Sequence, residues 1–428
     1  MTPSFRLLAR RRFLPLFVTQ FLGAFNDNLF KTAMVLFVTY EVFSNPEAEA
    51  GFSAVATALF IIPFFLLSAV SGQLADSRDK SAIIRLVKLA EIVIMAVGSA
   101  GLMLAPAMPR VAIGIMLLAV LAMGVHSTFF GPIKYAILPQ HLYDDEVLGG
   151  TGLVEASTYL AILAGTIIAG FISAQVTAAV VISVAVVGWL SGRQVPPAPA
   201  LGKPAPVDIH VVRASFRLVS HTLHIPRLFL AICAISFFWM VGTVLIIEFP
   251  PLVKNVFTAD QTVASLFLAV FSVGVAIGSV LINRLLGGVV SARYSPASVI
   301  SMGSFVLMMW YVAGHWQGLP EGQLYNYLEF ARHPGAIWVF AALLGVAISG
   351  GMFVVPLYAF LTTTVPKDMT ARTVAANNIV NSGAMVGGAV GIMAASALGV
   401  TVLDALVIVS VMCLIAAWLA WKLHRACD

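Results

Sequence analysis

The sequence predicts an all-α membrane protein with twelve transmembrane helices arranged in two six-helix halves. The chain has 428 residues, of which 60% are hydrophobic and only 10% are charged, whereas soluble domains carry about 25% charged residues. The apolar residues form long continuous runs, which favours helices because the strands of a barrel alternate. A span needs roughly 20 apolar residues, so the chain has room for about twelve.

The predicted spans fall into two groups of six. The first group is 13–40, 53–75, 83–105, 110–132, 148–172 and 174–191. The second group is 228–249, 262–287, 294–314, 335–361, 371–397 and 399–421. Between them lies a segment that is first rich in proline and then basic. We therefore predict an N-terminal bundle over 1–192, a cytoplasmic linker over 193–227 and a C-terminal bundle over 228–428.

The distribution of basic residues predicts the orientation in the membrane. Of the 24 Lys and Arg, 20 lie in termini and connections on one predicted side, only Arg110, Lys254 and Arg332 lie on the other, and Lys31 is inside the first predicted span. This count places Lys80 and Lys88 in the connection after the second span. Cytoplasmic loops carry the excess of basic residues, so both termini are predicted to be cytoplasmic, at the inner membrane. The net charge of +5 then reflects topology and contact with membrane lipids; nucleic-acid binding is not expected.

No catalytic or metal-binding motif stands out in the sequence. The cysteines, Cys233, Cys413 and Cys427, are far apart and join no Cys/His cluster, so they predict neither a disulfide framework nor a metal site. Walker, G-x-S-x-G and H-E-x-x-H patterns are absent. We expect a transporter that is not an enzyme, needs no cofactor, and is driven by a gradient or by the distribution of its substrate.

The first predicted span carries a polar stretch, Gln20-Phe21-Leu22-Gly23-Ala24-Phe25-Asn26-Asp27-Asn28-Leu29-Phe30-Lys31. Charged side chains near the middle of a membrane are costly unless they pair or face a cavity. Asp27 and Lys31 are four residues apart, so they can pair along one helix face. We predict a substrate-binding site formed by Asp27, Asn28 and Lys31; the alternative is an ion pair that only locks the helix.

Further candidate residues lie in later spans. Glu155 is about two turns inside its span, where a carboxylate needs a partner, and we expect Lys134 or a ligand amine to supply it. Asn381 occupies the related position in the second half. His126 is expected to be an interior residue more than a proton carrier, and it is grouped with the substrate-binding candidates. Lys134 is either a gate residue or an anchor at the membrane surface.

The connection after the second span reads Gly72-Gln73-Leu74-Ala75-Asp76-Ser77-Arg78-Asp79-Lys80. It resembles the signature loop of the major facilitator superfamily, G-x-L-a-D-r-x-G-r-k, and departs from it at Ser77 and Asp79. Gly72 permits close helix packing, and the carboxylate of Asp76 can meet a helix N-terminus or a basic partner. We predict a cytoplasmic gate that involves Gly72, Asp76, Lys80 and Lys134. The alternative is an ordinary charged turn.

Several segments, taken in order, resemble the lysophospholipid transporters of this superfamily and the transporter half of fusions with glycerophospholipid acyltransferases. These segments are 20–31, 72–76, 131–138, 152–158, 350–357 and 381–382. The resemblance implies the major facilitator fold. It also implies transport of lysophospholipid, chiefly lysophosphatidylethanolamine, from the outer to the cytoplasmic leaflet of the inner membrane. There a separate acyltransferase would restore the second acyl chain.

The resemblance also implies roles for individual residues. Asp27 and Glu155 become candidates for contacts with the headgroup ammonium or for gating pairs, and Lys134 for a phosphate contact or a gate. The family often has an Arg shortly after a Phe-Trp pair in the seventh helix, but here Phe238-Trp239 is followed by uncharged residues. We therefore assign the phosphate contact to Lys31, because a zwitterionic headgroup needs one anion and one cation.

Two other functions fit the same sequence. A proton-coupled exporter of drugs or small metabolites would use Asp27 or Glu155 as its proton carrier, because a fold does not fix a substrate. A non-transporting scaffold that supports an acyltransferase is the other alternative. Charges in the middle of the membrane argue against the scaffold. We expect the protein to be a monomer.

Overall fold

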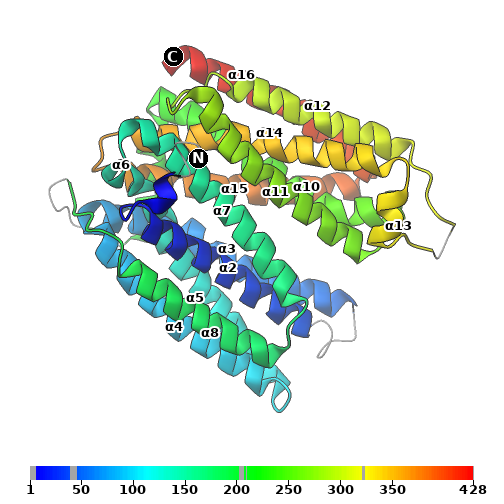
Figure 1. Cartoon of the computed structure of the whole chain (residues 1–428), viewed down its shortest axis with the longest axis horizontal. Coiled ribbons are helices and arrows are strands. Elements are labelled where there is room, and N and C mark those ends of the chain that lie inside the picture. Colours follow the sequence, from blue (N-terminus) through cyan, green and yellow to red (C-terminus); the bar gives the residue numbers. More distant parts are fainter. Residues whose placement is uncertain (1–5, 39–45, 202–206, 209, 321–322, 428) are drawn as a thin grey trace. The chain divides into compact units, whose positions relative to one another are not determined.

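The computed structural model describes residues 6–38, 46–201, 207–208, 210–320 and 323–427 (Figure 1). Over these residues it contains twelve long helices. Six are α2 (Leu14–Phe37), α3 (Pro46–Ser77), α4 (Lys80–Leu104), α5 (Pro109–Ala136), α7 (Asp144–Ala169) and α8 (Ala174–Gly192). The other six are α10 (Pro226–Pro251), α11 (Gln261–Leu286), α12 (Ser295–Gly314), α14 (Ala336–Thr363), α15 (Thr370–Ala397) and α16 (Val402–Cys427).

Short helical elements occupy the ends and connections. They are η1 (Leu7–Ala9), α6 (Leu138–His141), α9 (Val211–Leu223), the π-helical turn η3 (Leu252–Val256) and α13 (Tyr327–Arg332). The described residues form no strand beyond one isolated bridge between Ala259 and Tyr325. The predicted all-α class is therefore confirmed.

Eleven of the described helices are long and apolar enough to cross a membrane. The polar stretch described above leaves α2 outside this group, but its 24 residues give a length of about 36 Å, which is sufficient to span. The protein is therefore a multi-pass membrane protein with twelve helices, as predicted.

Local sequence signals explain where many helices begin and end. Pro109 and Pro226 occupy first-turn positions, where a missing N–H costs nothing. Ser173 and Asp260 accept hydrogen bonds from the first backbone amides of α8 and α11. Gly287 ends α11 in the left-handed conformation, with φ of 60°.

One predicted assignment is wrong, and it affects the count of basic residues. Lys88 was counted with the connection after the second span, although it falls within the predicted span 83–105. In the structure α4 begins at Lys80, and Lys88 lies more than two turns inside it with a side chain that is fully buried. Lys88 therefore belongs to the helix and not to a surface connection. The basic excess on the predicted cytoplasmic side falls from 20 to 19 residues, which leaves the predicted orientation unchanged.

The chain forms two compact units. The first falls within Met1–Thr222 and Leu361–Ile379, and the second within Leu223–Phe360 and Val380–Asp428. The helix of the central segment, α9, therefore belongs to the first unit except for its last residue, Leu223. The division into bundles at 193–227 stays a prediction.

In the first unit α2 packs between α7 and α8, while α4 packs against α5 and α8 (Figure 1). Gly165 of α7 lies directly against the backbone of α2 at Phe25 and Leu29, where a Cβ atom would have no room. Small residues permit this close approach between membrane helices. The approach places the polar stretch of α2 inside the unit, surrounded by neighbouring helices.

In the second unit α16 packs against α10 and α12. Gly278 of α11 lies against the backbone of α14 at Ile348, a second close helix contact. An aromatic cluster that includes Phe257, Trp316 and Phe330 joins η3, α13 and the long connection before α14. The connection is therefore folded against the ends of the helices.

Candidate functional site

Asp27 is a carboxylate buried near the middle of α2, with 9% of the residue exposed. Ser127 of α5 donates a hydrogen bond from Oγ to Asp27 Oδ2 at 2.6 Å. No described residue donates a hydrogen bond to the other oxygen, Oδ1. A buried carboxylate oxygen is costly to leave without a partner. Oδ1 is therefore a position at which a ligand with hydrogen-bond donors can be bound.

His126 links Asp27 to a second carboxylate. Its Nδ1 lies 3.5 Å from Ser127 Oγ, and its Nε2 lies 3.3 Å from Glu91 Oε2 of α4. Ser127 donates its hydroxyl hydrogen to Asp27, so His126 and Ser127 lie between the two carboxylates, although His126 Nε2 makes no hydrogen bond to a described residue. His126 is buried, with 6% of the residue exposed, and it takes part in the polar network rather than facing an apolar core.

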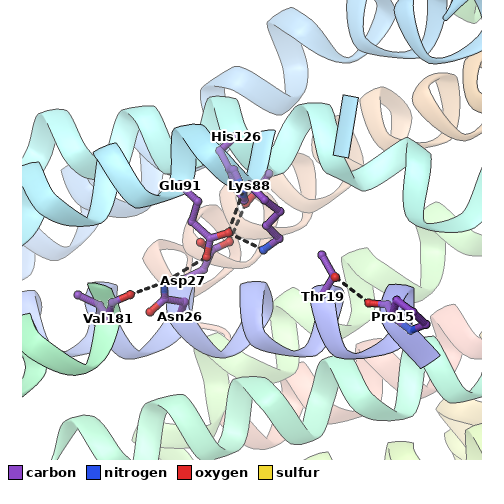
Figure 2. A network of polar contacts seen from close by, with 9 residues as sticks. Pro15, Thr19, Asn26, Asp27, Lys88, Glu91, His126 and Val181 are labelled. Carbon is purple, nitrogen blue, oxygen red and sulfur yellow. Dashed lines mark hydrogen bonds and ion pairs between the residues drawn. The ribbon is translucent and has the colours of Figure 1, made fainter. Parts of the chain in front are cut away.

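The partner of Glu91 is Lys88, three residues earlier on α4. Figure 2 shows the two side chains together with His126 and Asp27 in the interior of the first unit. Glu91 also accepts a hydrogen bond from Asn26 Nδ2 at 3.1 Å, and the same amide group donates to the carbonyl of Val181 on α8 at 3.1 Å. The Lys88–Glu91 ion pair is thus connected to α2, α5 and α8.

Sequence reasoning missed the Lys88–Glu91 pair, although a signal for it was present. Glu91 is the only acidic residue within the predicted span 83–105, and Lys88 precedes it by three residues. Residues three apart lie on the same helix face, and ionisable residues inside a span normally have a partner. Assigning Lys88 to a surface connection hid this pattern.

Gly23 of α2 provides space for the Lys88 ammonium. A Cβ atom at Gly23 would collide with Lys88 Nζ, and Gly188 and Gly192 of α8 border the same side chain. Three glycines on two helices therefore line the path of one buried lysine. The space that the Lys88 side chain needs explains why residue 23, within the polar stretch of α2, is a glycine.

The predicted pairing of Asp27 with Lys31 is found only as an electrostatic interaction without direct contact. None of the ion pairs of the described structure joins the two residues. Lys31 is half-buried, and its ammonium lies 5.1 Å from the centre of the Phe60 ring on α3. The face of an aromatic ring attracts a cation. The carboxylate of Asp27 instead accepts its hydrogen bond from Ser127. The neighbouring candidate, Asn28, donates to the carbonyl of Ala24 in its own helix at 2.8 Å.

Glu155 belongs to a separate polar cluster between α5 and α7. The hydroxyl of Tyr135 donates to Glu155 Oε1, and Glu155 is 2% exposed. The ammonium of Lys134 lies 4.8 Å from the centre of the Tyr135 ring. The expected partner, Lys134, is thus adjacent to the cluster, but Tyr135 makes the direct contact. No hydrogen bond or ion pair among the described residues joins Glu155 to Asp27.

Asn381 lies in the second unit, on α15. Its Oδ1 accepts a hydrogen bond from Ser236 of α10 at 2.7 Å, and its Nδ2 donates to the hydroxyl of Tyr358 on α14 at 3.3 Å. Trp239 donates from its indole N–H to the same hydroxyl at 2.8 Å. This network holds Trp239, the second residue of the Phe-Trp pair, in one orientation.

Asp76 of α3 meets the N-terminus of α15. The backbone amides of Ala371 and Arg372 donate to Oδ1 and Oδ2, each at 2.9 Å, and Arg372 Nε lies 3.6 Å from Oδ2. Gly72, one turn earlier, packs so closely against Ala371 and Ala375 that a Cβ atom would not fit. The carboxylate satisfies orphan amides and complements the helix dipole. The structure thus places the motif as its residue types suggested, while its role as a gate stays a prediction.

Asp79, which departs from the signature loop, is the N-cap of α4. Its carboxylate accepts hydrogen bonds from the amides of Ser81 at 2.8 Å and Ala198 at 3.2 Å, and its φ of −64° requires no glycine. Burial alone would raise the pKa of Asp79, but these hydrogen bonds outweigh it and hold the pKa below its usual range. The next residue, Lys80, is fully buried, and its amide donates to the carbonyl of Ala198 at 3.0 Å.

The described residues contain no group of three or more His, Cys, Asp or Glu side chains that could hold a metal ion. The groups around Asp27 are the hydroxyl of Ser127, the imidazole of His126 and the carboxylate of Glu91, whose charge is paired with the ammonium of Lys88. Such a set binds charged ligands by hydrogen bonds and ion pairs.

The twelve helices, the signature loop and the charges inside the membrane define a transporter. The sequence profile of the Major Facilitator Superfamily matches residues 16–389, and the chain belongs to this superfamily. Within it, the chain is 26% identical over 375 residues to "Lysophospholipid transporter LplT" of Serratia proteamaculans (strain 568), covering 84% of this chain and 82% of the relative. The protein of the same name from Cronobacter sakazakii (strain ATCC BAA-894) is 25% identical over 382 residues, covering 87% and 84%.

Solved structures agree on the fold. A bacterial homologue of the iron transporter ferroportin in an outward-facing state superposes with a TM-score of 0.72 at 14% identity, covering 97% of this chain and all of the other. The human organic anion transporter MFSD10 has a TM-score of 0.75 at 12% identity, covering 98% of this chain and all of that one. These comparisons confirm the major facilitator fold and the resemblance to lysophospholipid transporters.

Proposed function

We propose that the protein moves lysophospholipid, chiefly lysophosphatidylethanolamine, from the outer to the cytoplasmic leaflet by alternating access. The observation that carries the proposal is the free oxygen of Asp27, a membrane-buried carboxylate with one oxygen bound by Ser127 and the other without a donor. An ammonium group has only donors. Its charge-assisted hydrogen bond to Oδ1 would satisfy both partners.

Lys31 supplies the cation for the headgroup phosphate in this proposal. Four residues separate it from Asp27, which corresponds to about 6 Å along the helix. A phosphate and an ammonium joined by a two-carbon bridge can contact both side chains. Lys31 is half-buried, its ammonium lies over the ring of Phe60, and the charge of Asp27 acts on it without a direct ion pair. A phosphate would offer it a stronger partner than a neutral ring.

The remaining candidates receive supporting roles. His126 and Ser127 hold Asp27, Glu155 with Tyr135 is a second acidic position, and Asn381 positions Trp239 in the other unit. The motif of Gly72, Asp76 and Lys80, with Lys134, forms the cytoplasmic gate in this proposal. The relatives named lysophospholipid transporters support the choice of substrate.

We further propose that the protein is a monomer of the inner membrane with both termini in the cytoplasm. The excess of basic residues supports the orientation. Lysophospholipid delivered to the cytoplasmic leaflet would be the substrate of a separate acyltransferase, because a second acyl chain must be added before the product is an ordinary bilayer lipid.

Uptake of radiolabelled lysophosphatidylethanolamine into spheroplasts tests the proposal. The wild-type protein should increase uptake, and Asp27→Asn should lower it at least about tenfold, the factor that corresponds to about 1.4 kcal/mol. Asp145→Asn is the matched control, because Asp145 is exposed at the start of α7 and the chemical change is the same. Uptake by Asp27→Asn equal to that of wild type, at equal protein level, would remove Asp27 from the site. If the wild-type protein gave no uptake, lysophosphatidylethanolamine would not be its substrate.

A second candidate function, proton-coupled export, is favoured by one observation. Glu91, His126, Ser127 and Asp27 are titratable or hydroxyl groups that follow one another at distances of 3.3, 3.5 and 2.6 Å. A protonophore distinguishes the two functions. It should abolish transport by a proton-coupled exporter, whereas lipid transport down its own gradient should continue.

A further inference from the structure

The helix of the central segment, α9, has one buried face. Ala214 is buried and packs with Leu218 and Val219 against Ala69 of α3 and Ile379 of α15. The backbone amide of Asp208, shortly before α9, donates to the side-chain oxygen of Gln73 at 2.9 Å. The helix is therefore attached to the first unit along one side and is not a free linker.

The opposite face of α9 exposes apolar and basic side chains together. Val212 is 76% exposed and Phe216 is 78% exposed, and residues four apart lie on one helix face. Arg213 and Arg217, each the next residue along, form a parallel exposed row. Single exposed apolar residues are common, but here two large ones lie side by side with two arginines on a helix of only 13 residues.

The charge around α9 is strongly basic. Between residues 207 and 227 the sequence has three Arg and three His, and Asp208 is its only acidic residue. Arg217 Nη1 lies 3.7 Å from Asp208 while its side chain stays 62% exposed. Pairs this exposed contribute little, so both arginines remain available to an anionic partner.

The position of α9 along the chain places it at the surface of the membrane. The helix ends at Leu223, and the spanning helix α10 begins at Pro226. Three Cα–Cα steps cover at most about 11 Å, so the end of α9 lies near the level at which α10 enters the bilayer. An exposed row of Val212 and Phe216 at that level can enter the boundary between headgroups and acyl chains.

We propose that α9 is an interfacial helix that inserts Val212 and Phe216 into the lipid and binds the phosphates of anionic lipids through Arg213 and Arg217. A basic row beside an apolar row is the pattern of helices that lie in an anionic membrane surface. An acidic protein partner would use the arginines but would leave Phe216 without an apolar contact. This surface is independent of the transported substrate.

A spin label at position 216 tests the proposal without any transport measurement. Phe216→Cys is labelled in a full-length background in which Cys233, Cys413 and Cys427 are replaced by Ala, and a label at Asp145→Cys serves as the water-exposed reference. Both proteins are placed in lipid nanodiscs of phosphatidylcholine alone or mixed with phosphatidylglycerol. In the mixed discs, the label at 216 should be accessible to oxygen and protected from a water-soluble nickel chelate.

A charge-matched pair of variants tests the arginines. Arg213→Gln with Arg217→Gln should shift the equilibrium of α9 toward water by about 30-fold, because each basic residue near an anionic surface contributes about 1 kcal/mol. Arg10→Gln with Arg11→Gln removes the same charge from exposed positions elsewhere and should leave the label at 216 protected. If the nickel chelate reached the labels at 216 and 145 equally in both lipid mixtures, the proposal would be overturned. The exposed face of α9 would then be a binding surface for an acidic protein. Equal protection with and without phosphatidylglycerol would overturn the role of the arginines.

Discussion

The ammonium of Lys88 and the carboxylate of Glu91 form an ion pair within α4, and their side chains are 0% and 1% exposed. The two side chains are shielded from bulk solvent, so each charge depends on the other and on the contacts of Glu91 with Asn26 and His126. The pair lies at the point where α4 meets α2 and α5. It therefore supports the geometry of Asp27 without contacting Asp27 directly.

Removing one partner of this pair should destabilise the protein strongly. Glu91→Gln leaves the Lys88 ammonium buried without a counter-charge, a loss of about 3–5 kcal/mol. Thermal unfolding in detergent should show a large fall in Tm for this variant. The double variant Lys88→Met with Glu91→Leu should be more stable than Glu91→Gln, because no uncompensated charge remains. If Glu91→Gln unfolds at the same temperature as wild type, the pair does not support the unit.

Ser127→Ala should weaken substrate binding through Asp27. The substitution removes the donor to Asp27 Oδ2, and an unsatisfied buried acceptor costs about 1–3 kcal/mol. We expect a higher KM for lysophosphatidylethanolamine with a smaller change in the maximal rate. Ser183→Ala is the control, because the Ser183 hydroxyl is exposed and donates its hydrogen bond to the carbonyl of Ala179 in its own helix. Equal KM values for wild type and Ser127→Ala would contradict the assignment of Asp27 to the headgroup.

Asp76→Ala should loosen the first turn of α15. The amides of Ala371 and Arg372 lose their acceptor, and loss of such a cap costs about 0.5–2 kcal/mol. Hydrogen–deuterium exchange should show faster exchange at these two amides. Asp404→Ala removes a different cap, the acceptor of the Thr401 amide, and should accelerate exchange there and not at Ala371. If exchange at both amides were unchanged in Asp76→Ala, the carboxylate of Asp76 would not cap the N-terminus of α15.

The stability of the N-terminus of α4 should depend on pH through Asp79, its N-cap residue. Its hydrogen bonds hold the pKa of the folded protein below the ordinary value of 3.8. A carboxyl group with a lowered folded pKa stabilises above its unfolded pKa and loses that contribution as the pH falls through the folded pKa. The stability difference between wild type and Asp79→Ala should therefore be full at neutral pH and shrink below about pH 4. The measurement is Tm against pH, and a difference that grows in acid would contradict the sign.

Much of the architecture was predictable from composition and local pattern. Continuous apolar runs predict spans because lipid cannot satisfy backbone polar groups, and caps such as Asp260 mark helix starts. The beginning of α4 was not predictable in this way. Its first turns contain Lys80, Lys88 and polar neighbours that look like a surface connection, and only packing against other helices removes them from water.

The candidate site was predictable in part. Asp27, Lys31, Glu155 and Asp76 stand out because a charge in a span or at a helix end needs a physical reason. Their partners did not follow from spacing. Ser127, which holds Asp27, and Tyr135, which holds Glu155, are ordinary residues in sequence, and neither carries a charge that would single it out.

The sequence by itself determined the class of the protein and the unusual residues of α2, because burial in lipid restricts which residues a span can carry. The tertiary structure alone decided which charges meet. It placed Lys88 beside Glu91, connected that pair through His126 and Ser127 to Asp27, and left Lys31 beside the ring of Phe60. The physical reason is that each ion pair or hydrogen bond in the membrane depends on the distance between side chains of different helices, which the packing of the helices sets.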